Sequence, residues 1–471
     1  MMRRYLFVAM GITASAIAVL LLLSRGQGYL TDPGILAILT AIEFILAAVW
    51  SFRSRFFLVL MAAFMWAGIG LPFAAAWTSG RWFVLVAGVS AGCLAYLKES
   101  QLHLAAFHFA AFMCAATAIV SANISDFPQA ALLKALSLSL LFLYGLTGAR
   151  LAALGREKQF LSSLVIACEG LIYACGVAYF GFHYRLLGNP NSLGAIMGVV
   201  AVPLFLWEIL SSEHRNRRLR FTIAMMVALL LLFGSYARAG IVAAIFSSLL
   251  LCIAAGRYRA LIKGACLALL LAVTAATLTP RPETSDLTST FLYKGKREQG
   301  LLGSRRSVWD NTVAVIEAHP WLGVGFGTSK TSDEEIQPSE FAFHSEQPIT
   351  REHGNSYLAI TEWVGLLGDL PFLFLLSLIV VNAARIFIAL RRSGKVIAPA
   401  VPIATIMVAG LVHAAFEDWL FAVGYYLCVF FWSLAFILAD LAPWPSPLPV
   451  PPFAPPDCAP NFSSAHHAPV S

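Results

Sequence analysis

Charged residues are scarce in this sequence. Asp, Glu, Lys and Arg make up only 12% of the 471 residues, whereas 59% of the residues are hydrophobic. A soluble chain of this composition would have too few polar side chains to cover its surface. A polytopic membrane protein meets no such difficulty, because lipid is then the solvent for its apolar side chains. The sequence therefore predicts a membrane protein.

Cysteine patterns that would hold a metal or a disulfide framework are missing as well. The eight cysteines include no CxxC pair and no Cys/His cluster with metal-ligand spacing. Most of them lie in apolar runs, where we expect reduced core cysteines. The glycine-rich WLGVGFGTSKT of residues 321–331 lacks the GxxxxGK[ST] spacing of a nucleotide-binding P-loop. Neither a bound metal nor a nucleotide cofactor is indicated.

Apolar runs of about twenty residues are what the sequence has in abundance, and this length lets an α-helix cross a bilayer. We therefore expect an all-α polytopic membrane protein with about 12–14 transmembrane helices and one long exoplasmic (periplasmic) loop. The expected spans are residues 5–23, 34–52, 56–77, 82–97, 102–121, 131–153, 160–182, 191–210, 219–235, 239–255, 259–279, 356–390, 398–415 and 419–439.

Cations gather in every second loop, which is the pattern of cytoplasmic loops. The intervening loops are poor in cations, and SANISDFPQA and FEDW contain none. Both termini are accordingly predicted to be cytoplasmic, and the formal charge of +7 indicates no nucleic-acid partner. The cationic loops contain Arg3/Arg4, Arg53/Arg55, Lys98, Arg150/Arg156/Lys158, Arg215/Arg217/Arg218/Arg220, Arg257/Arg259/Lys263 and Arg391/Arg392/Lys395.

Three parts of the chain can be distinguished. Residues 1–180 are expected to form N-terminal transmembrane helices, and residues 181–440 a second membrane domain that includes a large periplasmic loop at 280–355. Within that loop, SVWDNTVAVIEAHP has helical spacing of apolar residues and predicts a short amphipathic helix. The proline-rich residues 441–471 predict a disordered cytoplasmic tail.

Several arginines fall on the predicted exoplasmic side, where the positive-inside bias disfavours them. Each one alone could reach up to lipid head groups. Together they would form a bidentate clamp for phosphate or pyrophosphate. Asn191 and Ser192 in GNPNS can cap a helix whose N-terminus is a further anion site, although a plain interhelical turn explains them equally well. The arginines are Arg185, Arg238, Arg305, Arg306 and Arg351.

The entry to the span at 356–390 is unusually polar. It reads REHGNSYLAITEWVGLLG over residues 351–368. His353 titrates near neutrality and could accept a proton from a hydroxyl at the membrane boundary. The alternative is that His353 caps the helix that begins near Ser356.

Three stretches together resemble the O-antigen ligase and O-antigen polymerase superfamily. They are YRLLGNPNSLG with the SYARAG turn, SRRSVWDNTVAVIEAHPWLGVGFG, and HGNSYLAITEWVGLLG, within about residues 180–420. The family pattern places His directly before Asn, whereas Gly354 intervenes here. The resemblance implies an integral membrane glycosyltransferase with a GT-C-like helical fold, in the bacterial inner (plasma) membrane, with no metal and no cofactor.

The resemblance also implies roles for particular residues. His353 becomes the catalytic base that activates the acceptor hydroxyl. Arg185 and Arg238 bind the pyrophosphate of an undecaprenyl-pyrophosphate-linked glycan, with Arg305 or Arg306 as helper. Asn191, Trp309 and Glu362 are expected to support the site.

The implied reaction is glycan transfer to lipid A core or a related acceptor, as in an O-antigen ligase. Polymerisation of repeat units and protein O-glycosylation share the same donor and remain alternatives. A polysaccharide transporter or flippase would place functional charges near the bilayer midplane and often carries internal repeats, and neither is seen here. A membrane scaffold without catalysis is the remaining class.

Overall fold

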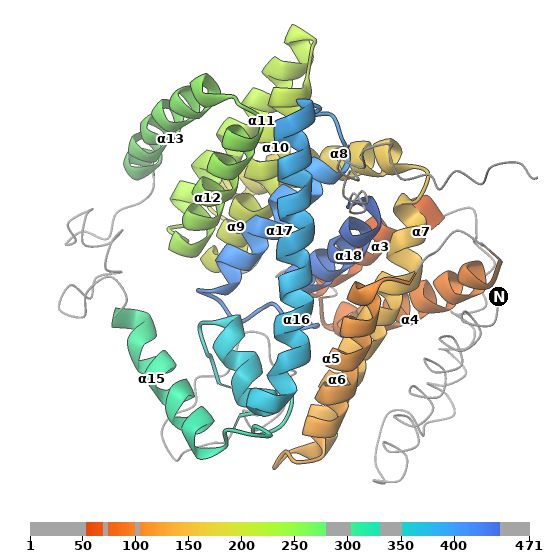
Figure 1. Cartoon of the computed structure of the whole chain (residues 1–471). Coiled ribbons are helices and arrows are strands. Elements are labelled where there is room, and N and C mark those ends of the chain that lie inside the picture. The colour runs from red at the N-terminus through yellow and green to blue at the C-terminus, as the bar shows by residue number, and fades with distance from the viewer. Residues whose placement is uncertain (1–52, 69–73, 99–103, 279–302, 330–350, 443–471) are drawn as a thin grey trace, which may run out of the picture.

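The computed structural model describes residues 53–68, 74–98, 104–278, 303–329 and 351–442. Within these ranges the regular structure is entirely helical (Figure 1), which confirms the predicted all-α fold. The helices are α3 Arg53–Ala67, α4 Ala74–Lys98, α5 Ala106–Ala122, α6 Pro128–Tyr144, η2 Gly145–Ala149, α7 Arg150–Ala153, α8 Glu157–Gly176, η3 Val177–Gly181, α9 Pro190–Ala195, η4 Ile196–Ala201, α10 Val202–Ser211, α11 Arg215–Gly234, α12 Arg238–Ala254, α13 Tyr258–Leu278, α15 Gly303–Ala318, α16 Ser356–Ser393, α17 Ala400–Ala414 and α18 Tyr426–Leu441.

The predicted spans correspond well to these helices. The first two, 5–23 and 34–52, lie outside the described residues, and every later one overlaps a described helix. Short π-helical stretches η2 and η4 join neighbouring α-helices into longer continuous ones, and η3 extends α8 to Gly181. Four described helices are long and apolar enough to cross a membrane, namely Pro128–Ala153, Glu157–Gly181, Pro190–Ser211 and Ser356–Ser393.

The predicted helix in the long loop is confirmed as α15, which ends one residue before His319-Pro320. A second prediction was wrong in detail. Asn189, not Asn191, caps α9, and its side-chain oxygen accepts a 2.7 Å hydrogen bond from the backbone N–H of Ser192. The reason is Pro190, whose fixed φ and missing N–H suit the first helical position directly after the cap.

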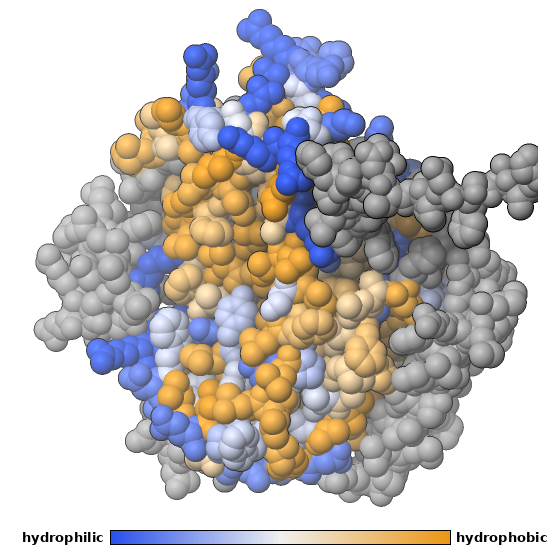
Figure 2. All heavy atoms as spheres, in the orientation of Figure 1, coloured by the Kyte–Doolittle hydropathy of each residue, from blue (hydrophilic) through white to orange (hydrophobic). Residues whose placement is uncertain are grey.

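A hydrophobic surface covers much of the middle of the molecule, and hydrophilic residues gather towards two ends (Figure 2). Large apolar side chains that lipid would contact are exposed on the helices, such as Leu269 on α13 and Leu370 on α16, which are 69% and 60% exposed. The described cysteines are free, as expected, although Cys266 is exposed on α13 rather than buried in the core.

Glycines bring α12 very close to the α9–η4 helix. A Cβ atom added to Gly198 would lie 2.6 Å from the carbonyl carbon of Gly240. One added to Gly240 would lie 2.9 Å from the carbonyl carbon of Gly194. Small residues allow this backbone approach in membrane helix pairs. The contact fixes the start of α12, and therefore Arg238, against the helix that follows GNPNS.

The long α16 connects the two ends of the molecule (Figure 1). Its N-terminal end lies beside α15 and the loop that joins α17 to α18. Its C-terminal end leads into the loop 394–399 at the opposite end. The polar entry to α16 and this distal loop are therefore separated by most of the length of the bundle.

Candidate active site

The polar residues before α16 fold against the start of that helix. Asn355 caps the helix, because its side-chain oxygen accepts hydrogen bonds from the backbone N–H groups of Tyr357 and Leu358. The cap is thus Asn355 and not His353. The histidine is instead turned into the protein, where only 1% of it is exposed. At this depth its neighbours, and not water, determine its protonation.

Three polar side chains surround the ring of His353. Its Nε2 lies 3.2 Å from Oε1 of Glu362 and 3.2 Å from the hydroxyl of Ser329. Its Nδ1 lies 3.4 Å from Oδ2 of Asp418, which also accepts a 2.9 Å hydrogen bond from the backbone N–H of His353. Trp363 packs edge-on against the imidazole, with 5.5 Å between ring centroids. The imidazole is therefore held between two buried carboxylates.

The two carboxylates favour the protonated imidazole. Burial alone would lower the pKa of His353, but Glu362 and Asp418 outweigh this effect and raise the pKa to about 8. Burial would raise the pKa of Asp418, but its hydrogen bonds with His353 hold that pKa below the usual value. His353 is therefore mostly protonated at neutral pH and becomes a free base just above it.

Two arginines pair with the acidic residues around this histidine. Arg351 forms an ion pair with Glu362. Arg305, from the first turn of α15, forms a 2.5 Å ion pair with Glu352 and a second ion pair with Glu417. Burial would lower the pKa of Arg305, but these two carboxylates raise it. Arg305 therefore links α15 both to the entry of α16 and to the loop after α17.

Glu417 and Asp418 come from the short FEDW loop between α17 and α18. The hydroxyl of Ser356 donates a 2.6 Å hydrogen bond to the Glu417 carbonyl oxygen and accepts one of 3.1 Å from the backbone N–H of Leu420. These bonds fix the acidic loop against the start of α16. The sequence identifies FEDW only as a loop without cations. It does not reveal that Glu417 pairs with Arg305 or that Asp418 contacts His353. The available signal was the presence of two adjacent acids in a short loop between two apolar runs.

A sharp break divides α16 at Gly365, where the expected span had been continuous. This glycine has φ 69° and ψ 174°, a conformation essentially restricted to glycine. On one side of the break, the carbonyl oxygens of Glu362 and Trp363 accept hydrogen bonds of 3.0 Å from the backbone N–H groups of Val324 and Gly325. The glycine-rich segment after α15 thus supplies the hydrogen bonds that the broken helix lacks.

The same segment places Ser329 beside His353. On the other side of the break, the N–H of Leu366 donates a 2.7 Å hydrogen bond to the carbonyl oxygen of Pro320. The hydroxyl of Thr328 bonds that of Ser125 at 2.7 Å, and Lys134 donates to the carbonyl oxygen of Gly327. WLGVGFG and the two residues after it therefore dock on α16, on the loop between α5 and α6, and on α6.

Trp309 supports the entry to α16 from α15. Its Nε1 donates a 3.2 Å hydrogen bond to the carbonyl oxygen of Gly354. Gly354 has φ 61°, and a Cβ atom at this position would lie 2.7 Å from a guanidinium nitrogen of Arg305. The glycine between His353 and Asn355 thus permits both a left-handed backbone and close contact with Arg305.

The predicted arginines lie in different surroundings. Arg238 begins α12 and lies within electrostatic range of Arg305. Arg185 is exposed and acts on Tyr179, whose hydroxyl donates a 2.7 Å hydrogen bond to the carbonyl oxygen of Gly234 near the start of α12. Arg306 points to solvent, with its side chain 84% exposed and 3.8 Å from Asp310.

The geometry thus combines a buried histidine held by two acids with nearby arginines, at one end of an all-helical bundle with membrane-spanning helices. This arrangement defines a polytopic membrane protein with a polar site suited to proton transfer and anion binding.

Residues 223–373 match the family model of the O-antigen ligase, which supports placing the chain in the O-antigen ligase superfamily as its motifs predicted. The matched region contains Arg238, Arg305, Trp309, His353 and Glu362. It ends before the acidic loop with Asp418. The family implies a membrane glycosyltransferase-like activity with lipid-linked glycan substrates. A search of the curated proteins found no match.

Proposed function

We propose that this protein transfers a glycan from undecaprenyl pyrophosphate to an acceptor hydroxyl at the periplasmic face of the bacterial inner membrane, as an O-antigen ligase does. The observation that carries the proposal is the buried His353 between Glu362 and Asp418, with Arg305 within reach of the same acidic loop. A base and a cation at the start of a transmembrane helix suit this reaction, because a lipid-linked donor and an acceptor from the aqueous phase would meet there.

In the proposed step the acceptor oxygen attacks the anomeric carbon of the donor sugar. A new C–O bond forms while the C–O bond to the pyrophosphate breaks, and the lipid pyrophosphate leaves with the electron pair. The acceptor proton passes to Nε2 of neutral His353, at the position where the Ser329 hydroxyl now lies. Asp418 and Glu362 stabilise the imidazolium that results.

Arg305 and Arg238 are the cations that we assign to the leaving pyrophosphate, since they lie within electrostatic range of one another. Arg305 already pairs with Glu352, whose side chain is 48% exposed. A pyrophosphate with two negative groups would displace this exposed carboxylate more readily than the less exposed Glu417. We also assign Arg185 to the pyrophosphate of the donor, on the side away from Arg305.

The two adjacent arginines of α15 provide a matched test. Arg305→Lys is expected to lower turnover on the order of tenfold or more, because lysine keeps the charge but cannot make paired contacts to pyrophosphate. Arg306→Lys is the control and should stay near the wild-type rate, since this side chain faces solvent. Turnover is measured with purified enzyme and a lipid-linked donor. Equal rates for the two variants would remove Arg305 from the proposed site.

Activity should rise with pH through about 8. Only the neutral imidazole accepts a proton, and the fraction of neutral His353 grows as pH passes its raised pKa of about 8. The contribution of this group to folding stability runs the other way. Because its folded pKa exceeds the unfolded value, that contribution is complete below the unfolded pKa of about 6.5 and is lost as pH rises through about 8.

Asp418→Asn separates a positioning role from a purely structural one. Without this carboxylate the pKa of His353 should fall, so the midpoint of the pH–rate profile should move to lower pH. Rates are measured between pH 5 and pH 9 for wild type and variant. A reduced rate with an unchanged midpoint would indicate that Asp418 acts only on folding.

The proposed orientation can be tested by cysteine labelling. We propose that the end with α15 and His353 is periplasmic and that both termini are cytoplasmic. Asn311→Cys on the exposed face of α15 should react in intact cells with a membrane-impermeant maleimide, whereas Arg392→Cys at the other end of α16 should react only after lysis. Unaltered protein corrects for native Cys266. The reverse labelling pattern would contradict the orientation and the mechanism together.

The glycolipid profile of a deletion strain tests the function itself. Accumulated long lipid-linked polymer together with uncapped acceptor would support the ligase. Single lipid-linked repeats would indicate a polymerase, and an unchanged profile would favour a protein acceptor or a polysaccharide transporter. If the wild-type gene restores the normal glycolipid profile and a gene with His353 replaced does not, the changed profile results from loss of the candidate site.

A further inference from the structure

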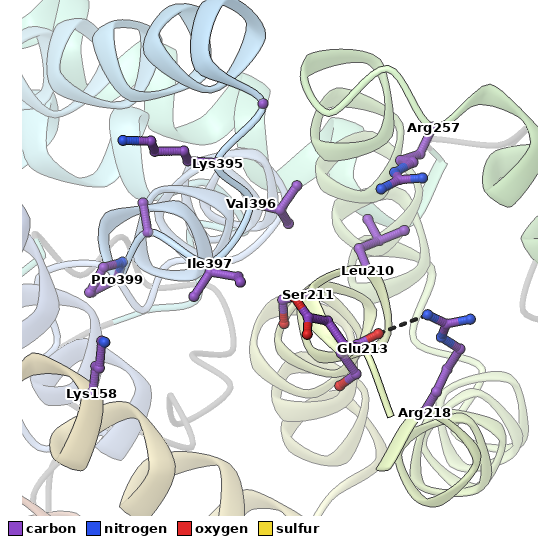
Figure 3. Close-up of a pocket in the computed structure, with 13 residues that line it drawn as sticks. Lys158, Leu210, Ser211, Glu213, Arg218, Arg257, Lys395, Val396, Ile397 and Pro399 are labelled. Carbon is purple, nitrogen blue, oxygen red and sulfur yellow. Dashed lines mark hydrogen bonds between the residues drawn. The ribbon is translucent and has the colours of Figure 1, made fainter. Parts of the chain in front are cut away.

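A cavity of about 650 Å³ lies at the end of the molecule opposite His353 (Figure 3). It is formed by the loop that follows α16, the residues from the end of α10 to the start of α11, the start of α8 and the residue before α13. The uninterrupted part of α16 from residue 366 to 393 separates it from the candidate active site. The cavity is of a size that accommodates a small ligand or a lipid head group.

Four cations and one acid line this cavity. Lys158 and Lys395 lie on one side, and Arg218 and Arg257 lie on the other, together with Glu213 (Figure 3). Arg218 is held in place because its Nη2 donates a 2.8 Å hydrogen bond to the carbonyl oxygen of Ser212. The cavity therefore concentrates positive charge from four separate segments of the chain.

Helix N-termini add to this positive potential. Lys158 is the second residue of α8, Arg218 lies in the first turn of α11, Arg257 directly precedes α13, and Pro399 directly precedes α17. The N-caps of α8, α11 and α17 make no side-chain capping hydrogen bond. The positive ends of these helix dipoles border the cavity together with the negative C-terminal ends of α10 and α16 at Ser211 and Gly394, so its positive potential comes mainly from the four cations.

Apolar side chains line the cavity beside these cations. They are Leu210 at the end of α10 and Val396 and Ile397 in the loop after α16, and Ile397 is 56% exposed. A ligand with an anionic head and hydrocarbon chains would place its head among the cations and its chains along these side chains.

We propose that this cavity binds a phosphate-bearing anion, namely the head group of an anionic phospholipid. The charge pattern of the loops predicts that this end is cytoplasmic, and anionic lipids attract basic segments at that surface. A soluble phosphate compound shares the same chemistry, so the test has to separate the two sources. The site is independent of the glycan-transfer reaction.

The test compares two double variants of equal charge. Arg218→Gln with Arg257→Gln removes two cations from the cavity. Arg215→Gln with Arg259→Gln removes two cations from the same ends of α11 and α13 but outside the lining. Purified full-length proteins in detergent are titrated with short-chain phosphatidylglycerol, with phosphatidylcholine as the neutral lipid, and bound lipid is counted by native mass spectrometry.

The cavity variant should bind phosphatidylglycerol about tenfold more weakly than the control variant, whereas phosphatidylcholine should bind weakly to both. Lys158→Gln with Lys395→Gln should repeat the result, so misfolding after loss of the Arg218 hydrogen bond can be recognised. Phosphatidylglycerol that stays bound in excess inorganic phosphate would assign the site to lipid, and displacement by phosphate would assign it to a soluble compound. Equal losses in cavity and control variants, or none, would overturn the proposal.

Discussion

Replacement of His353 by glutamine is expected to lower glycan transfer by a factor of roughly 10² to 10⁴, the usual contribution of a general acid–base residue. Glutamine fills a similar volume and can still bond Glu362 or Asp418, but it has no group that takes up a proton near neutral pH. Single-turnover rates with saturating donor and acceptor measure the chemical step directly.

The control for this variant is His214→Gln, an exposed histidine that precedes α11 at the other end of the molecule. Loss of the imidazolium also removes the cation beside Asp418 and one of the two cations beside Glu362, which keeps its ion pair with Arg351. The yield of folded protein and its Tm are therefore measured in parallel. A folded His353→Gln protein with wild-type turnover would exclude the histidine as the base. The glycan-transfer proposal would then need another proton acceptor.

Replacement of Gly365 by alanine is expected to disrupt the active-site end of α16. Alanine at φ 69° and ψ 174° is strained by about 1–3 kcal/mol. The new Cβ atom would also overlap backbone atoms of Trp321 and Leu322, which cannot move without breaking the hydrogen bonds to the helix. We expect a clearly lower Tm and a large loss of activity.

The matched control is Gly170→Ala. Gly170 lies within α8, and a Cβ atom there meets nothing within 4 Å. Alanine is favoured over glycine in a helix by up to about 1 kcal/mol, so this variant should be as stable as wild type or slightly more stable. If both variants behaved alike, the break at Gly365 would not be required for the site.

Element positions were largely predictable because lipid imposes a simple rule on the sequence. A helix that crosses the bilayer needs a long apolar run, and runs of this kind were readily found. The amphipathic pattern of α15 was equally clear. The break at Gly365 was not visible, because EWVGLLG reads as one continuous apolar helix. Its cause is tertiary, since hydrogen bonds from residues 320–325 replace those of the helix.

Only part of the candidate site could be predicted from the sequence, because some of its contacts also depend on tertiary packing. The family resemblance points to both His353 and Glu362, and the structure places the His353 ring 3.2 Å from the Glu362 carboxylate. Asp418 lies 65 residues further along and reaches His353 only through the packing of α17 and α18 against α16. Charge alone also could not distinguish Arg305 from Arg306, because only the direction of each side chain on α15 separates them.

That 65-residue separation has a consequence for how the protein is made. A ribosome synthesises His353 and Glu362 well before it reaches the FEDW loop, so the first half of the site is inserted without Asp418 and Glu417. The hydrogen bonds of the Ser356 hydroxyl with Glu417 and Leu420 can form only after that loop has been synthesised. The candidate site is therefore completed by the hairpin of α17 and α18, and a chain released after α17 would carry His353 without Asp418.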